Sequence, residues 1–504
     1  MEVELKLLIK PADVAALRRH PLLKQLATAK PRKQPQQDSY FDTPDLQLRA
    51  AGAGLRVRRV GGGWIQTLKA GGSVAGGLHS RHEWESPVAG PLPELAALRA
   101  LVGKKGPWGK LLRSAEFEER LQSLFEIDVV RTVWDLRLAD GGEIEFVLDQ
   151  GRIDCGGQSV PISEIELELK SGDPLHLFDF ALALQQDIAL RIGNRSKAGR
   201  GYALLAPQPD KAVTAAPIVL STQMSLVQAF QTIASNCLTQ IQSNEAGVEC
   251  RSDPESLHQM RVGLRRLLGA IGLLQRWQPC PVSLRDELDW LAAQLGPARD
   301  WDVLAGTTLS TMADMPSDID IAGMTLAARR TAQAAHDIAS AAIGTARYTR
   351  LMLGLARWLF GIAAVDEQTA TPLHLTFIVH DLLARNQERL ARRSHQLRDG
   401  TPQARHRLRI AIKKLRYATE FFSSLYPEKN MRRYARALAG LQDQLGARND
   451  AAVAGRLLQQ LQLAQPELAG SIGFVRGTLA VGIERDDKAV RRRCEELAAI
   501  SLAG

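Results

Sequence analysis

The chain opens with a strict alternation of charged and apolar residues. Glu2, Glu4 and Lys6 alternate with Val3 and Leu5. Successive side chains of a β-strand point to opposite faces, so this spacing predicts a strand with two carboxylates and one ammonium group on one face. The same alternation returns in residues 55–58, 81–85, 142–151 and 164–170. These segments predict a β-rich first part of the chain.

Charges of both signs share one face of several of these predicted strands. A strand of an ordinary sheet turns such a face to water, and that interpretation stays open for any one of them. Several such strands together favour a barrel with a charged interior. Carboxylates gathered there would repel one another unless divalent cations neutralised them, and arginine and lysine beside them suit phosphate oxygens. The pattern therefore indicates a site for a metal–polyphosphate complex.

The pattern changes at residues 206–217, a stretch with three prolines and little periodicity that we predict to be a linker. Before it, helical spacing is confined to residues 11–26 and 175–186. After it, long stretches rich in Leu, Ala, Gln and Arg have helical spacing and few strand signals. The sequence thus predicts an α+β domain over residues 1–205 and an all-α domain over residues 218–504.

The predicted helical domain contains an internal repeat. Residues 258–267 are similar to residues 406–415 at an offset of 148. Residues 291–300 are similar to residues 441–450 at an offset of 150. Two motifs that recur in the same order predict a duplicated helical bundle with pseudo-two-fold symmetry. Its halves would span about 218–365 and 366–504.

A basic stripe recurs in both copies of the repeat. Its members at helical spacing are His258, Arg261 and Arg265 in the first copy and His406, Arg409 and Lys413 in the second, widened by Arg266, Lys414 and Arg416. A solvated helix face is the usual role of such a stripe, but neither segment carries acids at pairing distance. Aromatic residues are not interleaved with the basic ones, so bases would find no stacking platform. The stripe therefore favours a chain of phosphates over nucleic acid.

Charge is unevenly distributed over the 504 residues. Residues 1–210 hold 28 Lys and Arg against 27 Asp and Glu, and the remainder holds 36 against 28. The excess in the helical part favours an anionic partner. Five scattered cysteines argue against a disulfide framework or a zinc site and fit a reducing compartment. Without a visible signal peptide or an apolar run of about eighteen residues, the expected location is the cytoplasm, with no membrane association.

A series of motifs in the first part resembles one known family. They are Glu2-x-Glu4-x-Lys6, residues 39–44, residues 55–59, residues 66–69, Arg81-x-Glu83, the strand with Asp149, Glu164-x-Glu166-x-Glu168 and residues 196–202. Over residues 1 to about 205 the chain resembles the CYTH superfamily, the triphosphate tunnel metalloenzymes. The resemblance implies an eight-stranded antiparallel β-tunnel with helices packed outside.

This resemblance implies a divalent-metal-dependent triphosphatase that hydrolyses inorganic triphosphate to pyrophosphate and phosphate. The ligands of Mg²⁺ or Mn²⁺ would be Glu2, Glu4, Glu83, Asp149, Glu164 and Glu166, with Glu168 on the same face but past the end of the tunnel. The residues that bind phosphate oxygens would be Lys6, Arg56, Arg58, Lys69, Arg81, Arg131 and Lys197. Those expected to be essential for catalysis are Glu4, Lys6, Arg58 and Asp149.

The helical part resembles a second family, the histidine-containing CHAD domains. The resemblance rests on the two His-x-x-Arg helices and on the turns at residues 296–300 and 446–450. It implies that the nine residues of the stripe bind inorganic polyphosphate, and that the protein associates with polyphosphate granules.

Two other functions stay open at this point. The chain could be a polyphosphate-binding or granule-associated protein with weak or no catalysis. It could also be an adenylate cyclase or a nucleotide triphosphatase. No aromatic pair is committed to a base, and the fusion to a predicted polyphosphate binder favours inorganic triphosphate as the substrate.

Overall fold

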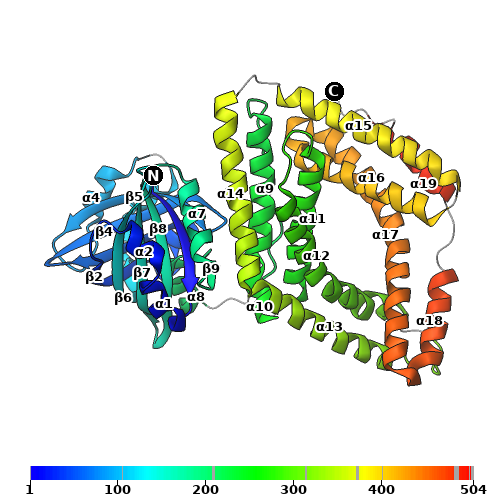
Figure 1. Ribbon diagram of the computed structural model, residues 1–504, viewed down its shortest axis with the longest axis horizontal. Helices are drawn as coiled ribbons and strands as arrows, with labels where there is room; N and C mark the ends of the chain where they lie inside the picture. Colours follow the sequence, from blue (N-terminus) through cyan, green and yellow to red (C-terminus); the bar gives the residue numbers. More distant parts are fainter. Residues whose placement is uncertain are drawn as a thin grey trace. The chain divides into compact units, whose positions relative to one another are not determined.

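The computed structural model describes residues 2–104, 106–206, 211–251, 253–312, 315–369, 374–399, 401–481, 487–498 and 500. The chain divides into two units (Figure 1). Residues 1–209 together with 344–361 form the barrel unit, and residues 210–343 together with 362–504 form the helical unit. The segment 344–361 lies in the range predicted for the first helical half, but it groups with the strands.

The barrel unit is built on an antiparallel sheet that closes on itself. Its strands are β1 (Glu2–Ile9), β2 (Arg32–Asp42), β3 (Ala53–Val60), β4 (Gly63–Ala75), β5 (Leu78–Val88), β6 (Gln122–Arg137), β7 (Glu143–Cys155), β8 (Gln158–Ser171) and β9 (Leu190–Ile192). The order is β5-β4-β3-β2-β6-β7-β8-β1-β9, and a further pairing of β1 with β5 closes a ring of eight strands. The short β9 continues the edge of β1 beyond β5. The predicted antiparallel tunnel is thereby confirmed, with β9 as an addition.

Helices cover the outside of the ring. They are α1 (Val14–Arg18), α2 (Pro21–Leu26), α3 (Gln47–Ala50), α4 (Leu95–Leu101), α5 (Pro107–Leu111), α6 (Ala115–Glu119), α7 (Leu175–Leu184) and α8 (Lys197–Leu205), with the first part of α14 (Ala346–Thr369). Leu5, Leu7 and Phe146 face outward from their strands and are fully buried against α1, α2 and α7. Leu353 and Ala356 of α14 join the same core. Burial of each such side chain stabilises the fold by about 1.5–3 kcal/mol. Because successive side chains of a strand point to opposite faces, burying the apolar ones on the outside turns the charged ones to the inside of the ring.

The turn after β2 is organised by one buried carboxylate. Asp42 is fully buried and accepts hydrogen bonds from the backbone N–H groups of Thr43, Leu48 and Arg49, at 2.8, 2.9 and 3.0 Å. The Tyr202 hydroxyl of α8 donates a fourth, at 3.1 Å. Asp42 therefore ties the start of α3 to α8, which explains why an Asp at the end of a strand is needed here.

The helical unit consists of long helices joined by short turns. They are α9 (Leu226–Ser243), α10 (Glu245–Cys250), α11 (Pro254–Leu274), α12 (Val282–Val303), a π turn η2 (Leu304–Thr308), α13 (Ile321–Ile343), α15 (Leu375–His395), α16 (Pro402–Phe421), α17 (Glu428–Ala464), α18 (Ala469–Val481) and α19 (Asp487–Ala498). Short 3₁₀ turns lie at Ser310–Met312, Gln396–Asp399, Ser423–Leu425 and Pro466–Leu468.

Helix packing in this unit follows the sequence repeat. α9 packs on α11, α11 on α12 and α12 on α13, while α15 packs on α16, α16 on α17 and α17 on α18. The two copies meet where α11 contacts α16. The prediction of an all-α part made of two pseudo-symmetric bundles is confirmed, and the two repeated basic segments lie on the helices that join the copies.

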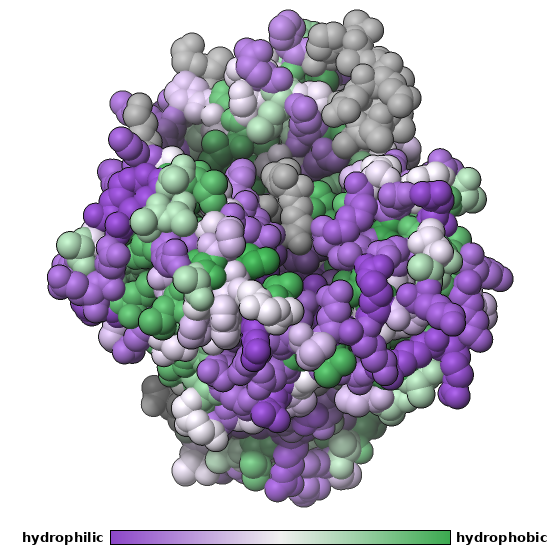
Figure 2. Space-filling view, turned by 90° about the vertical axis from the view of Figure 1, so that its left-hand side faces the viewer, coloured by the Kyte–Doolittle hydropathy of each residue, from purple (hydrophilic) through white to green (hydrophobic). Residues whose placement is uncertain are grey.

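The protein has a mostly hydrophilic face, as expected when the apolar side chains are packed into cores (Figure 2). On this face, hydrophilic side chains predominate among the described residues, and hydrophobic ones lie in small separate groups. None of the helices in the described ranges has the length and apolar character needed to cross a membrane.

Replacing Asp42 by Asn tests the role of this turn. The amide nitrogen would face N–H and O–H donors that the carboxylate now accepts from, so we expect a loss of about 1–3 kcal/mol of local stability. Hydrogen exchange resolved to peptides should become faster in residues 43–50 and 197–205. Asp45→Asn, in the same turn but exposed, is the matched control. Unchanged exchange in both segments would contradict this account.

Candidate active site

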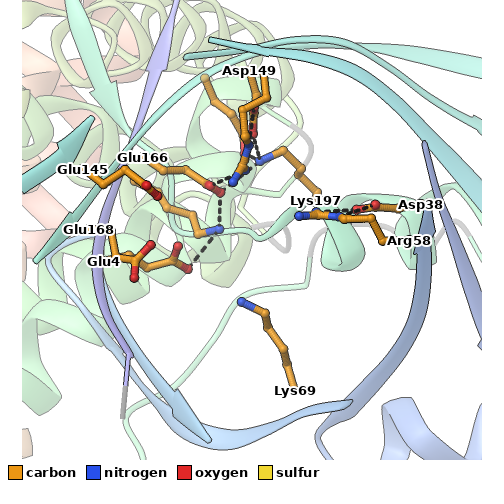
Figure 3. A network of polar contacts seen from close by, with 12 residues as sticks. Glu4, Asp38, Arg58, Lys69, Glu145, Asp149, Glu166, Glu168 and Lys197 are labelled. Atoms are coloured by element: carbon orange, nitrogen blue, oxygen red, sulfur yellow. Dashed lines mark hydrogen bonds and ion pairs between the residues drawn. The ribbon is translucent and has the colours of Figure 1, made fainter. Parts of the chain in front are cut away.

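The ring encloses a cavity of about 570 Å³ to which every one of its eight strands contributes. The lining is mostly charged (Figure 3). Its charged members are Glu4, Lys6, Arg49, Arg56, Arg58, Lys69, Glu83, Glu85, Arg131, Glu166, Glu168 and Lys197. Most are residues whose strand parity predicted an inward side chain. The cavity therefore has the charged interior that the alternation indicated.

Glutamates of two neighbouring strands form an acidic wall, which consists of Glu4, Glu166 and Glu168. In the register of β1 and β8, Glu4 lies opposite Glu168, and Lys6 lies opposite Glu166. The Lys6 ammonium is 3.1 Å from a Glu4 oxygen and 2.7 Å from a Glu166 oxygen. Glu168, expected past the end of the tunnel, instead lines the cavity and pairs with Lys170 at 2.7 Å.

A buried carboxylate cluster adjoins this wall. It consists of Asp149, Glu164 and Glu166, whose oxygens lie within 4.8 Å of one another. The Lys197 ammonium, at the start of α8, is 2.7, 2.6 and 2.9 Å from the three of them in that order. Arg131 donates two hydrogen bonds to Asp149, at 2.9 and 2.7 Å, and one to Glu166, at 2.8 Å. The cluster is therefore compensated by cations of the protein itself.

These cations favour the ionised forms of Glu166 and Asp149. Burial would raise the pKa of Glu166, but Lys197, Lys6 and Arg131 outweigh it and hold that pKa well below the usual value. The pKa of Asp149 is lowered in the same way, against burial, by Lys197 and Arg131. Burial would lower the pKa of Lys197, yet the three carboxylates raise it well above its usual value. These directions favour the charged forms of Glu166, Asp149 and Lys197 at neutral pH.

Cations of β3 and β4 form the cationic wall, which consists of Arg56, Arg58 and Lys69. Arg58 donates two hydrogen bonds to Asp38, at 2.6 and 2.7 Å, and Arg56 lies 3.7 Å from the same carboxylate. Lys69 is 3.1 Å from Glu83. Asp38 is buried and holds the two guanidinium planes in place. Glu83 therefore lies among the cations rather than on the acidic wall.

The structure brings together most of the predicted site residues. Those that line the cavity are Glu4, Lys6, Arg56, Arg58, Lys69, Glu83, Arg131, Glu166 and Lys197. Asp149 and Glu164 are not part of its lining and lie in the buried cluster. The backbones of Glu2 and Arg81 pair across β1 and β5, and their side chains lie outside the described residues. Sequence reasoning missed Asp38, although it lies directly opposite Arg58 in the β2–β3 register.

In the helical unit, the two basic stripes face each other where α11 meets α16. Burial and the charges of Arg409, Arg265 and Arg416 lower the pKa of Lys413 to about 8. Arg265 belongs to α11 and Lys413 to α16, so cations of both copies repel across the contact. Arg261 donates to the Leu295 carbonyl oxygen at 3.1 Å. Acids offset only part of this positive charge: Asp300 lies 3.5 Å from Arg261, and Asp450 acts on Arg409 and Lys413.

The remaining predicted stripe residues differ in position. Arg266 is buried, donates to Glu420 at 2.6 Å and to Gln240 at 2.9 Å, and so has a structural role. Lys414 lies near Arg389 and Arg285, away from Lys413, and Arg416 stacks over the Tyr417 ring. His258 is half-buried near Arg299, and His406 is exposed.

The chain therefore joins two unlike domains, an antiparallel ring with a charged interior and a duplicated helical unit with basic stripes where its copies meet. The chain belongs to the proteins that join a CYTH domain to a CHAD domain, since family models match a CYTH domain over residues 1–202 and a CHAD domain over residues 232–459. A solved CHAD domain from the plant Ricinus communis is 37% identical, with a TM-score of 0.54, and the match covers 58% of this chain and 99% of that one.

A relative in Haemophilus influenzae is named inorganic triphosphatase. It is 39% identical over 172 residues, which are 34% of this chain and 46% of the relative. The chain thus spans less than half of that relative's length. The two matched domains confirm the family resemblance that the motifs indicated.

Replacing Lys197 by Met should make the barrel unit sensitive to acid. The pKa values of Glu166 and Asp149 lie below their ordinary values of 4.5 and 3.8, so the stabilisation is present above those values and is lost as pH falls through the lowered ones. Without Lys197 the two pKa values should rise, and breaking these buried pairs should cost about 3–5 kcal/mol. Acid titration followed by near-ultraviolet circular dichroism should then show unfolding at a higher pH.

Two further variants sharpen this test. Lys170→Met removes a lysine whose side chain is 42% exposed, and it should leave the midpoint of acid unfolding almost unchanged. Adding Glu164→Gln to Lys197→Met removes one carboxylate of the cluster, which keeps its contact with Arg200 at 3.2 Å but has lost Lys197, and should restore part of the acid stability. An acid midpoint that Lys197→Met leaves at its original pH would refute the compensation.

Proposed function

We propose that the barrel unit is a divalent-metal-dependent triphosphatase that hydrolyses inorganic triphosphate to pyrophosphate and phosphate. The observation that carries this proposal is the opposition of an acidic wall and a cationic wall across one cavity of about 570 Å³. Such a pair of walls suits a ligand that brings both a cation and a polyanion. The name of the Haemophilus influenzae relative supports the reaction.

Carboxylate oxygens are the donors that Mg²⁺ and Mn²⁺ prefer, so the acidic wall fits such an ion. We assign the metal to Glu4, Glu166 and Glu168, because all three line the cavity, whereas Asp149 and Glu164 do not. The ligand set expected from the sequence also included Glu2, Glu83, Asp149 and Glu164. A bound ion would supply charge neutralisation of the phosphates and lower the pKa of the attacking water.

Side chains of the protein would position the phosphate chain. The guanidinium groups of Arg56 and Arg58 are oriented by Asp38 and suit phosphate oxygens in a bidentate manner. Lys69 would add a third contact from the same wall. Asp149 and Glu164 would act indirectly, because they position the side chains of Lys197 and Arg131 at the cavity. In this scheme water is the nucleophile, and the protein contributes binding, orientation and charge.

The lining favours a bare phosphate chain over a nucleotide. Its aromatic members are Tyr40 and Tyr202. Tyr40 stacks on Phe125 at 4.8 Å, and Tyr202 meets the edge of the same ring at 5.2 Å. Both rings are thus engaged in the core. Cyclic AMP formation from ATP would instead support the adenylate cyclase alternative.

We further propose that the helical unit binds inorganic polyphosphate through His258, Arg261, Arg265, His406, Arg409 and Lys413. The repulsion of Arg409 and Lys413 by Arg265 across the α11–α16 contact supports this proposal, because a polyanion would relieve it. Arg266, with its buried ion pair, is left out of the set. Association with polyphosphate granules in the cytoplasm would follow from such binding. If polyphosphate binding were found without triphosphate hydrolysis, the primary function of the protein would be polyphosphate binding.

Replacing Glu4 by Gln should reduce triphosphate hydrolysis by at least about a hundredfold, since it removes a charged oxygen ligand from the acidic wall. Phosphate release from inorganic triphosphate, ATP and long-chain polyphosphate, with Mg²⁺ and with Mn²⁺, measures this. Polyphosphate binding by the same variant should persist. Glu143→Gln alters an exposed glutamate of β7 outside the cavity and is the matched control. Undiminished turnover by Glu4→Gln would exclude the tunnel as the catalytic site.

Reversing the charge of Arg265 and Lys413 together should weaken long-chain polyphosphate binding by at least about tenfold and flatten its dependence on salt. The measurement is a polyphosphate titration of the full chain at two ionic strengths. The control is the pair Lys429→Glu and Arg476→Glu, which makes the same charge change at exposed positions of α17 and α18. Equal losses in both pairs would show a general charge effect and no specific site.

A further inference from the structure

A second cavity, of about 490 Å³, lies within the helical unit. It is bordered by the end of α10, the start of α11, the end of α12, the π turn η2 and α13. All of its lining residues belong to the first copy of the repeat. None of the six residues proposed above to bind polyphosphate lines it, although Arg299 lies close to His258 and Arg261 of that set.

Positive charge converges on this cavity from three elements. Arg251 follows α10, Arg299 lies on α12, and Arg329 lies on α13. Arg251 is paired with Asp337 at 2.6 Å. Arg299 and Arg329 form no ion pair with any residue in the described ranges. Two guanidinium groups of different helices are therefore available to an anion.

The acids of the cavity are already engaged. Asp302 accepts hydrogen bonds from His336 Nε2 at 3.0 and 3.1 Å, and this pair is largely buried. Asp253 caps α11 by accepting from the Glu255 N–H at 2.9 Å. The carboxylates thus do not compete for Arg299 and Arg329.

The cavity also breaks the symmetry of the repeat. At the offset of 150 that aligns Asp300 with Asp450, Asp302 corresponds to Ala452, so the second copy lacks this His–Asp arrangement. At the same offset the π turn corresponds to residues 454–458, which lie inside the uninterrupted helix α17. π turns inside helices occur often at functional sites. Folding of the repeat needs neither feature, because the second copy folds without them.

We propose that this cavity is a binding site for a phosphate group, held by Arg299 and Arg329 with Arg251 at its rim. Guanidinium groups that approach from several directions can contact several oxygens of a tetrahedral phosphate, whereas a carboxylate ligand offers only two oxygens in one plane. The group can belong to free orthophosphate or pyrophosphate, or to the end of a polyphosphate chain. This site goes beyond the function proposed above and does not depend on it.

The test is a local one in the full-length protein without metal. Histidine ring nitrogens are labelled, and the His336 resonance is assigned by its loss in His336→Gln. Orthophosphate, pyrophosphate and long-chain polyphosphate are then titrated in turn. The proposal expects a saturable shift of this resonance with at least one of them. A shift with the two small anions identifies free phosphate as the source, and a shift with the long chain alone identifies a chain end.

A matched pair of variants separates this site from general charge. Arg329 and Arg330 are neighbours on α13 and both exposed, but Arg329 lines the cavity and Arg330 does not. Arg329→Glu should weaken binding, so that the half-saturating anion concentration rises at least about tenfold, as expected for loss of one charged hydrogen-bond partner. Arg330→Glu should leave it nearly unchanged. The proposal is overturned if no anion moves the His336 resonance, or if both variants weaken the response equally.

Gly306 offers a second variant with little risk to folding. It lines the cavity within the π turn, and a Cβ atom added there meets open space. Gly306→Asp would place a negative charge beside the arginines and should abolish the shift of the His336 resonance. Gly473→Asp, at an exposed position of α18 with equally open space, should not. A full response in Gly306→Asp would also overturn the proposal.

Discussion

The barrel depends on the neutralisation of carboxylates that it buries. Asp149, Glu164 and Glu166 lie within 4.8 Å of one another, and an uncompensated group of this kind would repel itself and lose its charge. Lys197 contacts all three, but it comes from α8, after the last strand of the ring. The charged interior is therefore complete only when α8 has packed against the ring. Asp42 serves the same end, because its contact with Tyr202 fastens α8 to the turn after β2.

Strand parity predicted which residues of the barrel face inward, because a one-residue slip would turn every side chain to the opposite face. It could not predict depth along the tunnel or the pairing of charges. Glu83 and Glu166 share the inward parity, yet one lies beside Lys69 and the other beside Lys6. Asp38 escaped notice because its strand lacks the strict alternation that marked β1 and β8. Its register partner Arg58 becomes apparent only when β2 and β3 are paired.

In the helical unit the repeat itself was visible in the sequence, because both copies keep their basic residues at helical spacing. Adjacent positions on a helix point about 100° apart, so stripe members side by side in sequence can separate in the fold. Arg265 is exposed, whereas Arg266 turns inward to Glu420. The π turn left no periodic signal, since it shifts the helix by a single residue. What the repeat alone could not reveal is where one copy departs from the other.

The two units handle charge in opposite ways, and this contrast constrains their ligands. The barrel balances its buried acids with its own cations, so the proposed metal ion would be expected to enter with negative charge of its own, as a metal–triphosphate complex does. The helical unit leaves Arg265, Arg409 and Lys413 in mutual repulsion, with the pKa of Lys413 lowered to about 8. An anion alone relieves that repulsion and needs no metal to do so. The two proposed functions would therefore differ in their requirement for divalent ions.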